Sequence, residues 1–131
     1  MSHTCLTPPP RLRQVLEHTH GGGDYWPLHV RAAAAHLAVL ENLIGDRYQP
    51  VLQCAVEAIY QEIEKPTRYD FLGLRRERAF ERRFGAASDV RLDLAYTMLN
   101  ALEALLDKDG YRAVIRAAWE ASNLEPQPDH A

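Results

Sequence analysis

The sequence predicts an all-α protein. Ala and Leu together supply more than a quarter of its 131 residues, a bias that favours helix along most of the chain. Apolar residues recur at helical spacing in several segments, and no alternating strand pattern of useful length interrupts them. Glycines and prolines separate these segments. We therefore expect a compact bundle of five to six helices in a single domain over 1–131, with flexible ends at about 1–8 and 123–131.

Two helices are predicted on either side of a glycine run. Three prolines at 8–10 precede apolar residues at helical spacing, and Gly21 ends the segment, so the first helix should cover about 9–20. Asp24 is suited to cap a second helix, whose apolar stripe ends at Gly45. The glycine run is therefore interpreted as the turn between these two helices.

The next two helices differ in how much apolar surface they carry. Pro50 opens and Pro66 closes a third segment, whose apolar residues follow the helical pattern closely. A fourth helix should begin near Asp70 and end at Gly85, but its apolar edge is narrow and its arginine face is wide. We therefore expect the fourth helix to bury little surface by itself.

The last two predicted helices are rich in apolar residues. Ser88 can cap a fifth helix, whose leucines cover more than one face, so this helix should be central. Asp109 can cap a sixth helix with apolar residues at regular helical spacing. The third, fifth and sixth helices should form the core through Val56, Ile59, Leu99, Leu102, Leu106, Ile115 and Trp119.

An internal similarity links two parts of the chain. Residues 37–57 align with 99–120 when one extra residue is allowed at Gly110, and eight positions are then identical. The identical pairs are Leu37/Leu99, Leu40/Leu102, Glu41/Glu103, Leu43/Leu105, Tyr48/Tyr111, Val51/Val114, Ala55/Ala118 and Glu57/Glu120. Each part should form a helical hairpin preceded by an extra helix. The alternative is that any two hairpins rich in Leu, Ala and Glu align this well.

Five arginines project from about two turns of the predicted fourth helix. They are Arg75, Arg76, Arg78, Arg82 and Arg83. The one opposite charge at helical spacing is Glu81, three residues after Arg78. Because guanidinium groups match carboxylates and phosphates, the anions must come from elsewhere in this protein or from a partner. One interpretation is a solvated face that is bridged to acidic neighbours such as Asp89 and Asp93.

Partner binding is the functional interpretation of this arginine face. The net charge of -3, the interleaved Glu77 and Glu81, and the lack of a recognition-helix motif argue against nucleic acid, which remains an alternative partner. We therefore predict a protein-interaction module, a bacterial or phage regulator or inhibitor of the anti-activator or immunity type, that binds an acidic protein surface. Homodimerisation through the fourth or fifth helix would fit the same design. In size and composition the chain is similar to small all-helical bacterial regulators, toxin-immunity proteins and phage inhibitors.

A metal-binding enzyme is the other alternative. His18, His20 and His29 flank the turn after the first helix, and an antiparallel hairpin would bring them together with Glu17 and Asp24 as oxygen ligands. No HExxH motif supplies a fixed third ligand, and no serine or cysteine lies in a catalytic motif. We therefore expect no catalysis, no bound metal and no cofactor.

The sequence carries no signal for a membrane or for export. No stretch approaches the roughly 20 uninterrupted apolar residues that span a bilayer. The first residues lack the basic start and apolar middle of a secretory signal. Cys5 and Cys54 lie in no paired spacing, so we interpret both as free thiols in a reducing compartment. These observations predict a soluble, cytoplasmic protein that does not engage a membrane.

Overall fold

The computed structural model describes residues 10–22, 26–66, 72–85 and 89–123, and within these ranges every regular element is a helix. The elements are α1 (Pro10–His20), α2 (Leu28–Ile44), the short 3-10 helix η3 (Gly45–Arg47), α3 (Tyr48–Glu64), α4 (Leu72–Phe84), α5 (Val90–Leu105) and α6 (Lys108–Asn123). The predicted all-α bundle of five to six helices is confirmed. None of the helices in these ranges is long and apolar enough to cross a membrane.

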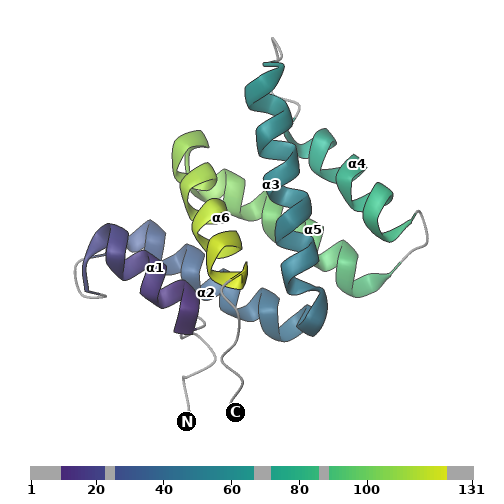
Figure 1. Ribbon diagram of the computed structural model, residues 1–131. Helices are drawn as coiled ribbons and strands as arrows, with labels where there is room; N and C mark the ends of the chain where they lie inside the picture. The colour runs from purple at the N-terminus through teal and green to yellow at the C-terminus, as the bar shows by residue number, and fades with distance from the viewer. Residues whose placement is uncertain (1–9, 23–25, 67–71, 86–88, 124–131) are drawn as a thin grey trace.

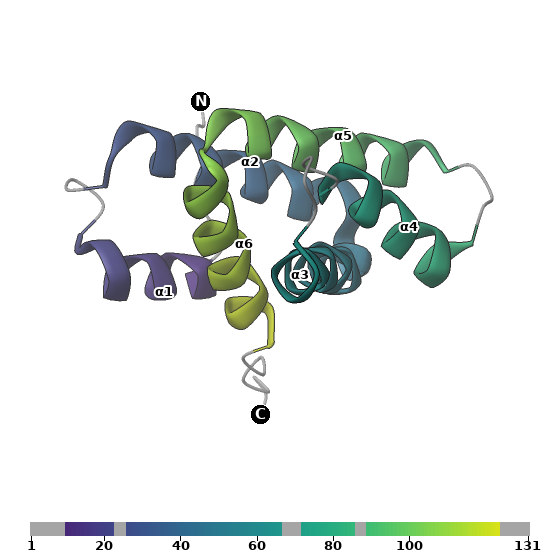
Figure 2. The same cartoon turned by 90° about the horizontal axis from the view of Figure 1, so that it is seen from above.

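The helices form two layers. α2 and α5 pack side by side behind the other helices in Figure 1, and α5 runs along the upper edge of Figure 2. In the second layer α3 packs against both α4 and α6, and α1 packs against the other side of α6. α3 and α6 therefore occupy the middle of the molecule, and α1 and α4 lie at its two ends.

Glycines end α1 and α4 in the same way. The backbone N–H of Gly21 donates to the carbonyl oxygen of Glu17 (2.8 Å), and that of Gly85 donates to Glu81 (2.8 Å). Both glycines have a positive φ, 87° and 84°, a conformation that glycine adopts without the steric cost of a Cβ. The predicted ends of the first and fourth helices are therefore confirmed.

The N-terminal capping residues differ from two of those predicted. The carboxylate of Asp89, rather than Ser88, accepts hydrogen bonds from the backbone N–H groups of Arg91 and Leu92 at the start of α5. Its pKa is lowered, mainly by a hydrogen bond from Arg47 and also by these backbone donors. At α6, Asp107 rather than Asp109 accepts the backbone N–H of Gly110 (2.7 Å). Ser88 itself and Asp24 lie outside the described residues.

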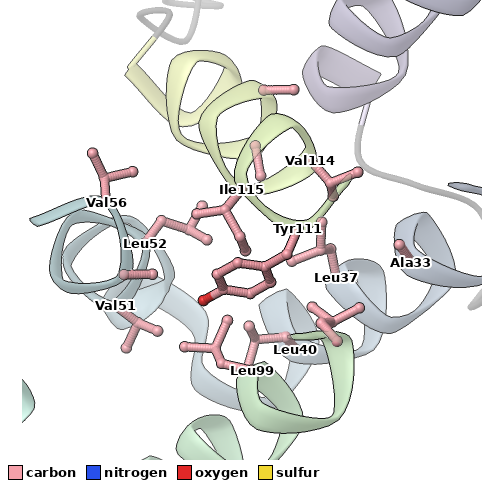
Figure 3. Close-up of a cluster of buried hydrophobic side chains, with 14 of the residues drawn as sticks. Ala33, Leu37, Leu40, Val51, Leu52, Val56, Leu99, Tyr111, Val114 and Ile115 are labelled. Atoms are coloured by element: carbon pink, nitrogen blue, oxygen red, sulfur yellow. The ribbon is translucent and has the colours of Figure 1, made fainter. Parts of the chain in front are cut away.

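The core lies where α2, α3, α5 and α6 meet. Figure 3 shows Tyr111 at the centre of a cluster that includes Leu37, Leu40, Leu52 and Leu99. Six of the seven predicted core residues are buried, and the seventh, Trp119, is partly buried against the cluster. The prediction that the fifth helix is central is wrong. α5 buries three residues within its span, whereas α2 buries seven and α3 buries nine.

The packing favours a genuine internal duplication. When α1–α3 are matched with α4–α6, the contact of α1 with α6 corresponds to the contact of α4 with α3. In addition, α2 packs against its counterpart α5, and α3 packs against its counterpart α6. Equivalent positions are also buried together, as in Ala33/Ala95, Leu37/Leu99, Leu40/Leu102, Ile44/Leu106, Tyr48/Tyr111, Val51/Val114, Leu52/Ile115, Ala55/Ala118 and Ala58/Ala121. These main contacts are the ones that an approximate two-fold axis between the two halves would produce.

The two hairpins do not pack as the sequence comparison predicts. α2 and α3 follow each other closely in the chain, but the main partner of α2 is α5, and α3 packs mainly against α4 and α6. The same holds for α5 and α6, whose contact with each other is slight. Each half therefore buries its apolar surface against the other half, so neither half has a separate core.

Burial of Cys54 leads to a prediction about its reactivity. Its thiol donates to the carbonyl oxygen of Ala79 (3.5 Å), and burial raises its pKa to about 11 from 9.0. Because the thiolate is the reactive form, we expect iodoacetamide to modify Cys54 slowly in the folded protein and rapidly in urea. A Cys5→Ser variant isolates this thiol, and mass spectrometry of quenched samples gives the rate. Fast modification of the folded protein at neutral pH would contradict the burial.

The same raised pKa gives a direction for stability against pH. The folded protein keeps the Cys54 thiol protonated where the unfolded chain ionises, so folding is favoured by this group below pH 9. The contribution is lost as the pH rises toward about 11. Urea unfolding should therefore show wild type losing stability relative to Cys54→Ala over this interval.

Candidate functional site

The five arginines of α4 divide into two that face the protein and three that face solvent. Arg76 is fully buried and Arg75 is about four-fifths buried. Arg78, Arg82 and Arg83 are exposed. The division follows the helix, because Arg76 lies on the same stripe as the buried Leu72 and Phe80.

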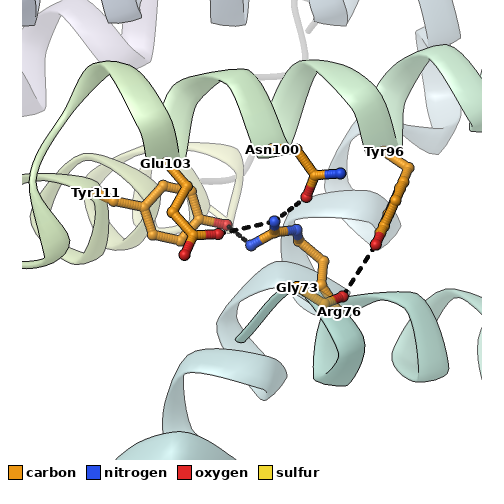
Figure 4. Close-up of polar contacts among 6 residues, drawn as sticks. All are labelled: Gly73, Arg76, Tyr96, Asn100, Glu103 and Tyr111. Carbon is orange, nitrogen blue, oxygen red and sulfur yellow. Dashed lines mark hydrogen bonds and ion pairs between the residues drawn. The ribbon is translucent and has the colours of Figure 1, made fainter. Parts of the chain in front are cut away.

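Arg76 is the centre of a buried polar network, shown in Figure 4. Its Nη1 donates to the hydroxyl of Tyr111 (2.9 Å), and its Nη2 donates to Oε1 of Glu103 (2.9 Å) and to Oδ1 of Asn100. The guanidinium also lies over the rings of Tyr96 and Tyr111, 5.8 and 5.4 Å from their centroids. This side chain therefore joins α4 to α5 and α6.

The burial of Arg76 corrects its predicted role. We predicted that it binds a partner, but its Nη1 and Nη2 donate to three groups of this chain and none of the side chain is exposed. Its Nε is buried without a hydrogen-bond partner among the described residues. Burial also raises the pKa of the neighbouring Tyr111 to about 12. The Tyr111 hydroxyl is therefore neutral when it accepts the hydrogen bond from Arg76. Arg76 is therefore a structural residue.

The first half of the molecule lacks this arginine. The position that corresponds to Arg76 by its spacing from the glycine that ends the helix is Leu12, which is also buried. Tyr48 is the counterpart of Tyr111, and its buried hydroxyl has no hydrogen-bond partner among the described residues. Burial raises the pKa of Tyr48 and of the neighbouring Glu41. The polar network is therefore a feature of the second half.

Arg75 fixes α4 to the end of α3. Its Nε donates to Oε1 of Glu62 (2.8 Å), a carboxylate that is itself buried, and its Nη2 donates to the carbonyl oxygen of Lys65 (3.0 Å). About a fifth of the Arg75 side chain remains exposed. Arg75 is therefore also engaged within the protein, at the edge of the surface.

Nearby carboxylates neutralise little of the positive charge of the three outer arginines. Arg82 approaches Glu57 of α3 at 3.9 Å, and both side chains are about half exposed. Arg78 and Arg83 form no ion pair within the described part of the chain, and the pair predicted between Arg78 and Glu81 is not formed there. We call Arg78, Arg82 and Arg83 the outer arginine cluster.

The carboxylates that pair with the arginines of α4 are not Asp89 and Asp93, the two acidic neighbours that the sequence suggested. Asp89 pairs with Arg47 (2.8 Å), and the side chain of Asp93 forms no ion pair with any described residue. The carboxylates that do contact α4 come from α3 and α5, namely Glu57, Glu62 and Glu103. These neighbours lie 13 to 27 residues away in sequence, so helical spacing within α4 could not identify them.

The predicted histidine site is described only in part. His18 and His29 are exposed, whereas the side chain of His20 and residues 23–25 of the turn lie outside the described residues. In the described ranges no group of three or more His, Cys, Asp or Glu side chains is placed to hold a metal ion.

No protein-family model, no curated protein and no solved structure matches this chain significantly.

Proposed function

We propose that this protein is a small interaction module, a regulator or inhibitor, that binds an acidic surface of a protein partner through the outer arginine cluster. The observation that carries the proposal is the split within α4. Arg75 and Arg76 are used inside the protein, whereas Arg78, Arg82 and Arg83 are exposed with one long contact to an acid among them. Catalysis plays no part in this proposal.

The inner arginines support the outer ones. Arg76 ties α4 to α5 and α6, and Arg75 ties its first turns to α3, so α4 is held on two sides by charge-assisted hydrogen bonds. A helix held in this way presents its outer side chains from a fixed backbone, so less conformational entropy is lost when a partner binds. Guanidinium forks on such a surface suit carboxylates, which they can bind in a bidentate manner.

The charges around the cluster favour a protein partner over nucleic acid. Glu57, Glu77 and Glu81 are exposed on α3 and α4 close to the arginines, and the whole chain carries a net charge of -3. The phosphates of a nucleic acid would be repelled by these carboxylates while they are attracted by the arginines. An acidic protein surface that also carries a few basic residues could match both charges. Nucleic acid is therefore the less favoured partner.

A pull-down tests the proposal. The tagged full-length protein, the triple variant Arg78→Ala/Arg82→Ala/Arg83→Ala, and a control that replaces Arg13, Arg91 and Lys108 with Ala are compared after nuclease treatment. The control removes the same charge from exposed positions outside α4. We expect wild type and control to retain one protein partner at moderate salt, and the triple variant to lose it.

Two results would contradict the proposal. Equal retention of the partner by the triple variant, with an unchanged helical spectrum, would mean that the outer arginines are only solvated. Recovery of nucleic acid in place of a protein, when nuclease is omitted and moderate salt is used, would make nucleic acid the partner.

We also propose a cytoplasmic location and self-association. The buried free thiol of Cys54 supports a reducing compartment.

A further inference from the structure

The layer formed by α2 and α5 is largely apolar on its outer side as well as on its buried side. The outer positions of α2 are Leu28, Ala32, Ala35, Val39, Asn42 and Leu43, and those of α5 are Val90, Leu94, Thr97, Ala101, Ala104 and Leu105. Leu43 lies at the edge of the outer side, where it also packs against the core. On each helix they lie opposite the buried residues, at the spacing of one helical stripe. A helix that is apolar on two opposite sides is usually covered on both, but within the described residues these two helices are covered on one side.

The exposed apolar side chains of the described residues concentrate on this layer. Of the eight large hydrophobic residues that are exposed there, five lie on α2 and α5, and they include Val39 (41%) and Leu94 (46%). No charged side chain occupies either outer stripe. We call these two stripes together the outer apolar face.

The internal two-fold relation places the two stripes at equivalent positions in the two halves. Outer residues of α2 correspond to outer residues of α5 that lie 62 positions later in the chain. The matched pairs are Leu28/Val90, Ala32/Leu94, Ala35/Thr97, Val39/Ala101 and Leu43/Leu105. Because the approximate axis exchanges α2 and α5, the face consists of two similar stripes related by that axis.

Opposite charges lie at equivalent positions beside the two stripes. Arg31 of α2 corresponds to Asp93 of α5, and both are exposed. Neither side chain forms a hydrogen bond or ion pair with any described residue. Since the internal axis exchanges their positions, the two charges lie on opposite sides of the centre of the face.

We propose that the outer apolar face binds a second copy of this chain. A two-fold axis that lies in the face and is perpendicular to the line from Arg31 to Asp93 places Arg31 of one copy over Asp93 of the other, and it does so twice. The small side chains of Ala32, Ala35 and Ala101 allow helices to approach closely along the same surface. The self-complementary charges favour a second copy over an unrelated protein.

The proposal is independent of the function proposed for the arginines. The outer arginine cluster lies on α4 in the other layer, so a dimer through α2 and α5 leaves it open. Two clusters on one dimer would bind a partner with two acidic patches more tightly than one cluster could. Failure of dimerisation would not affect the pull-down with the triple arginine variant.

Sedimentation velocity of the full-length protein over a dilution series tests the interface. We expect a dimer that the double variant Val39→Glu/Leu94→Glu converts to a folded monomer, because both side chains are exposed in the single chain. The matched control is Leu74→Glu on α4, which is also exposed (42%) and should remain dimeric. A monomer at every wild-type concentration, or a dimer that Val39→Glu/Leu94→Glu leaves intact, would overturn the proposal.

A charge exchange tests the arrangement within the dimer. Arg31→Asp and Asp93→Arg each place two like-charged pairs in the interface, so each should raise the dissociation constant about tenfold, or about 1.4 kcal/mol. The double variant restores opposite charges and should dimerise close to the wild-type level. Circular dichroism of each variant confirms folding. If the double variant is weaker than both single variants, Arg31 does not lie over Asp93 and the proposed arrangement is wrong.

Discussion

Replacing Arg76 with Met is expected to destabilise the fold by about 3 kcal/mol, the lower end of the usual cost of removing one partner of a buried charged pair, because the Glu103 side chain remains 23% exposed. Met retains much of the buried stem but donates no hydrogen bond. The hydroxyl of Tyr111 and the side chains of Asn100 and Glu103 would all lose this donor. Equilibrium urea unfolding, followed by circular dichroism, measures the loss.

The matched control for this variant is Arg83→Met, seven residues along the same helix. Arg83 is exposed and forms no ion pair with a described residue, so its replacement should change stability by less than about 0.5 kcal/mol. If Arg76→Met and Arg83→Met unfolded at the same urea concentration, the network around Arg76 would not stabilise the fold.

Truncating Leu37 or Leu99 to Ala should each cost about 3–5 kcal/mol, through lost burial and the cavity that remains. Both side chains are fully buried, and Figure 3 shows both close to Tyr111. They occupy equivalent positions in α2 and α5, where the two halves meet, so their costs should be similar. Thermal and urea unfolding of the two variants measure these costs.

Leu74→Ala provides the control for these core variants, because Leu74 is exposed on α4. A cost for Leu37→Ala or Leu99→Ala as small as that of Leu74→Ala would contradict the shared core. A single cooperative transition is also expected in every variant, since neither half has a core of its own.

The fold was predictable because most of its elements depend on local patterns. The apolar spacing between Pro50 and Pro66 identifies α3, and the glycines at 21, 45 and 85 mark the ends of three helices. The error on the fifth helix has a physical cause. Leucines on more than one face of α5 suggested complete burial, but Leu94 and Leu105 face away from the single chain.

The candidate site was only partly predictable. Helical spacing groups the five arginines on one helix, but it cannot show which of them meet acids from α3 and α5. The burial of Arg76 could have been predicted, because helical spacing places it on the same side of α4 as the apolar residues Leu72, Ala79 and Phe80. The partners Glu62 and Glu103 could not be identified, because their contacts with α4 depend on how distant helices pack.

The most direct test of the proposed function is the association rate with the captured partner, measured at several salt concentrations. Charge steering is screened over about 10 Å at 0.1 M salt, so wild type should associate fastest at low salt. The variant that lacks Arg78, Arg82 and Arg83 should associate more slowly there, and its rate should approach that of wild type as salt rises. The control that lacks Arg13, Arg91 and Lys108 should follow wild type. A triple arginine variant that matches wild type at every salt concentration would contradict partner binding through the outer arginine cluster.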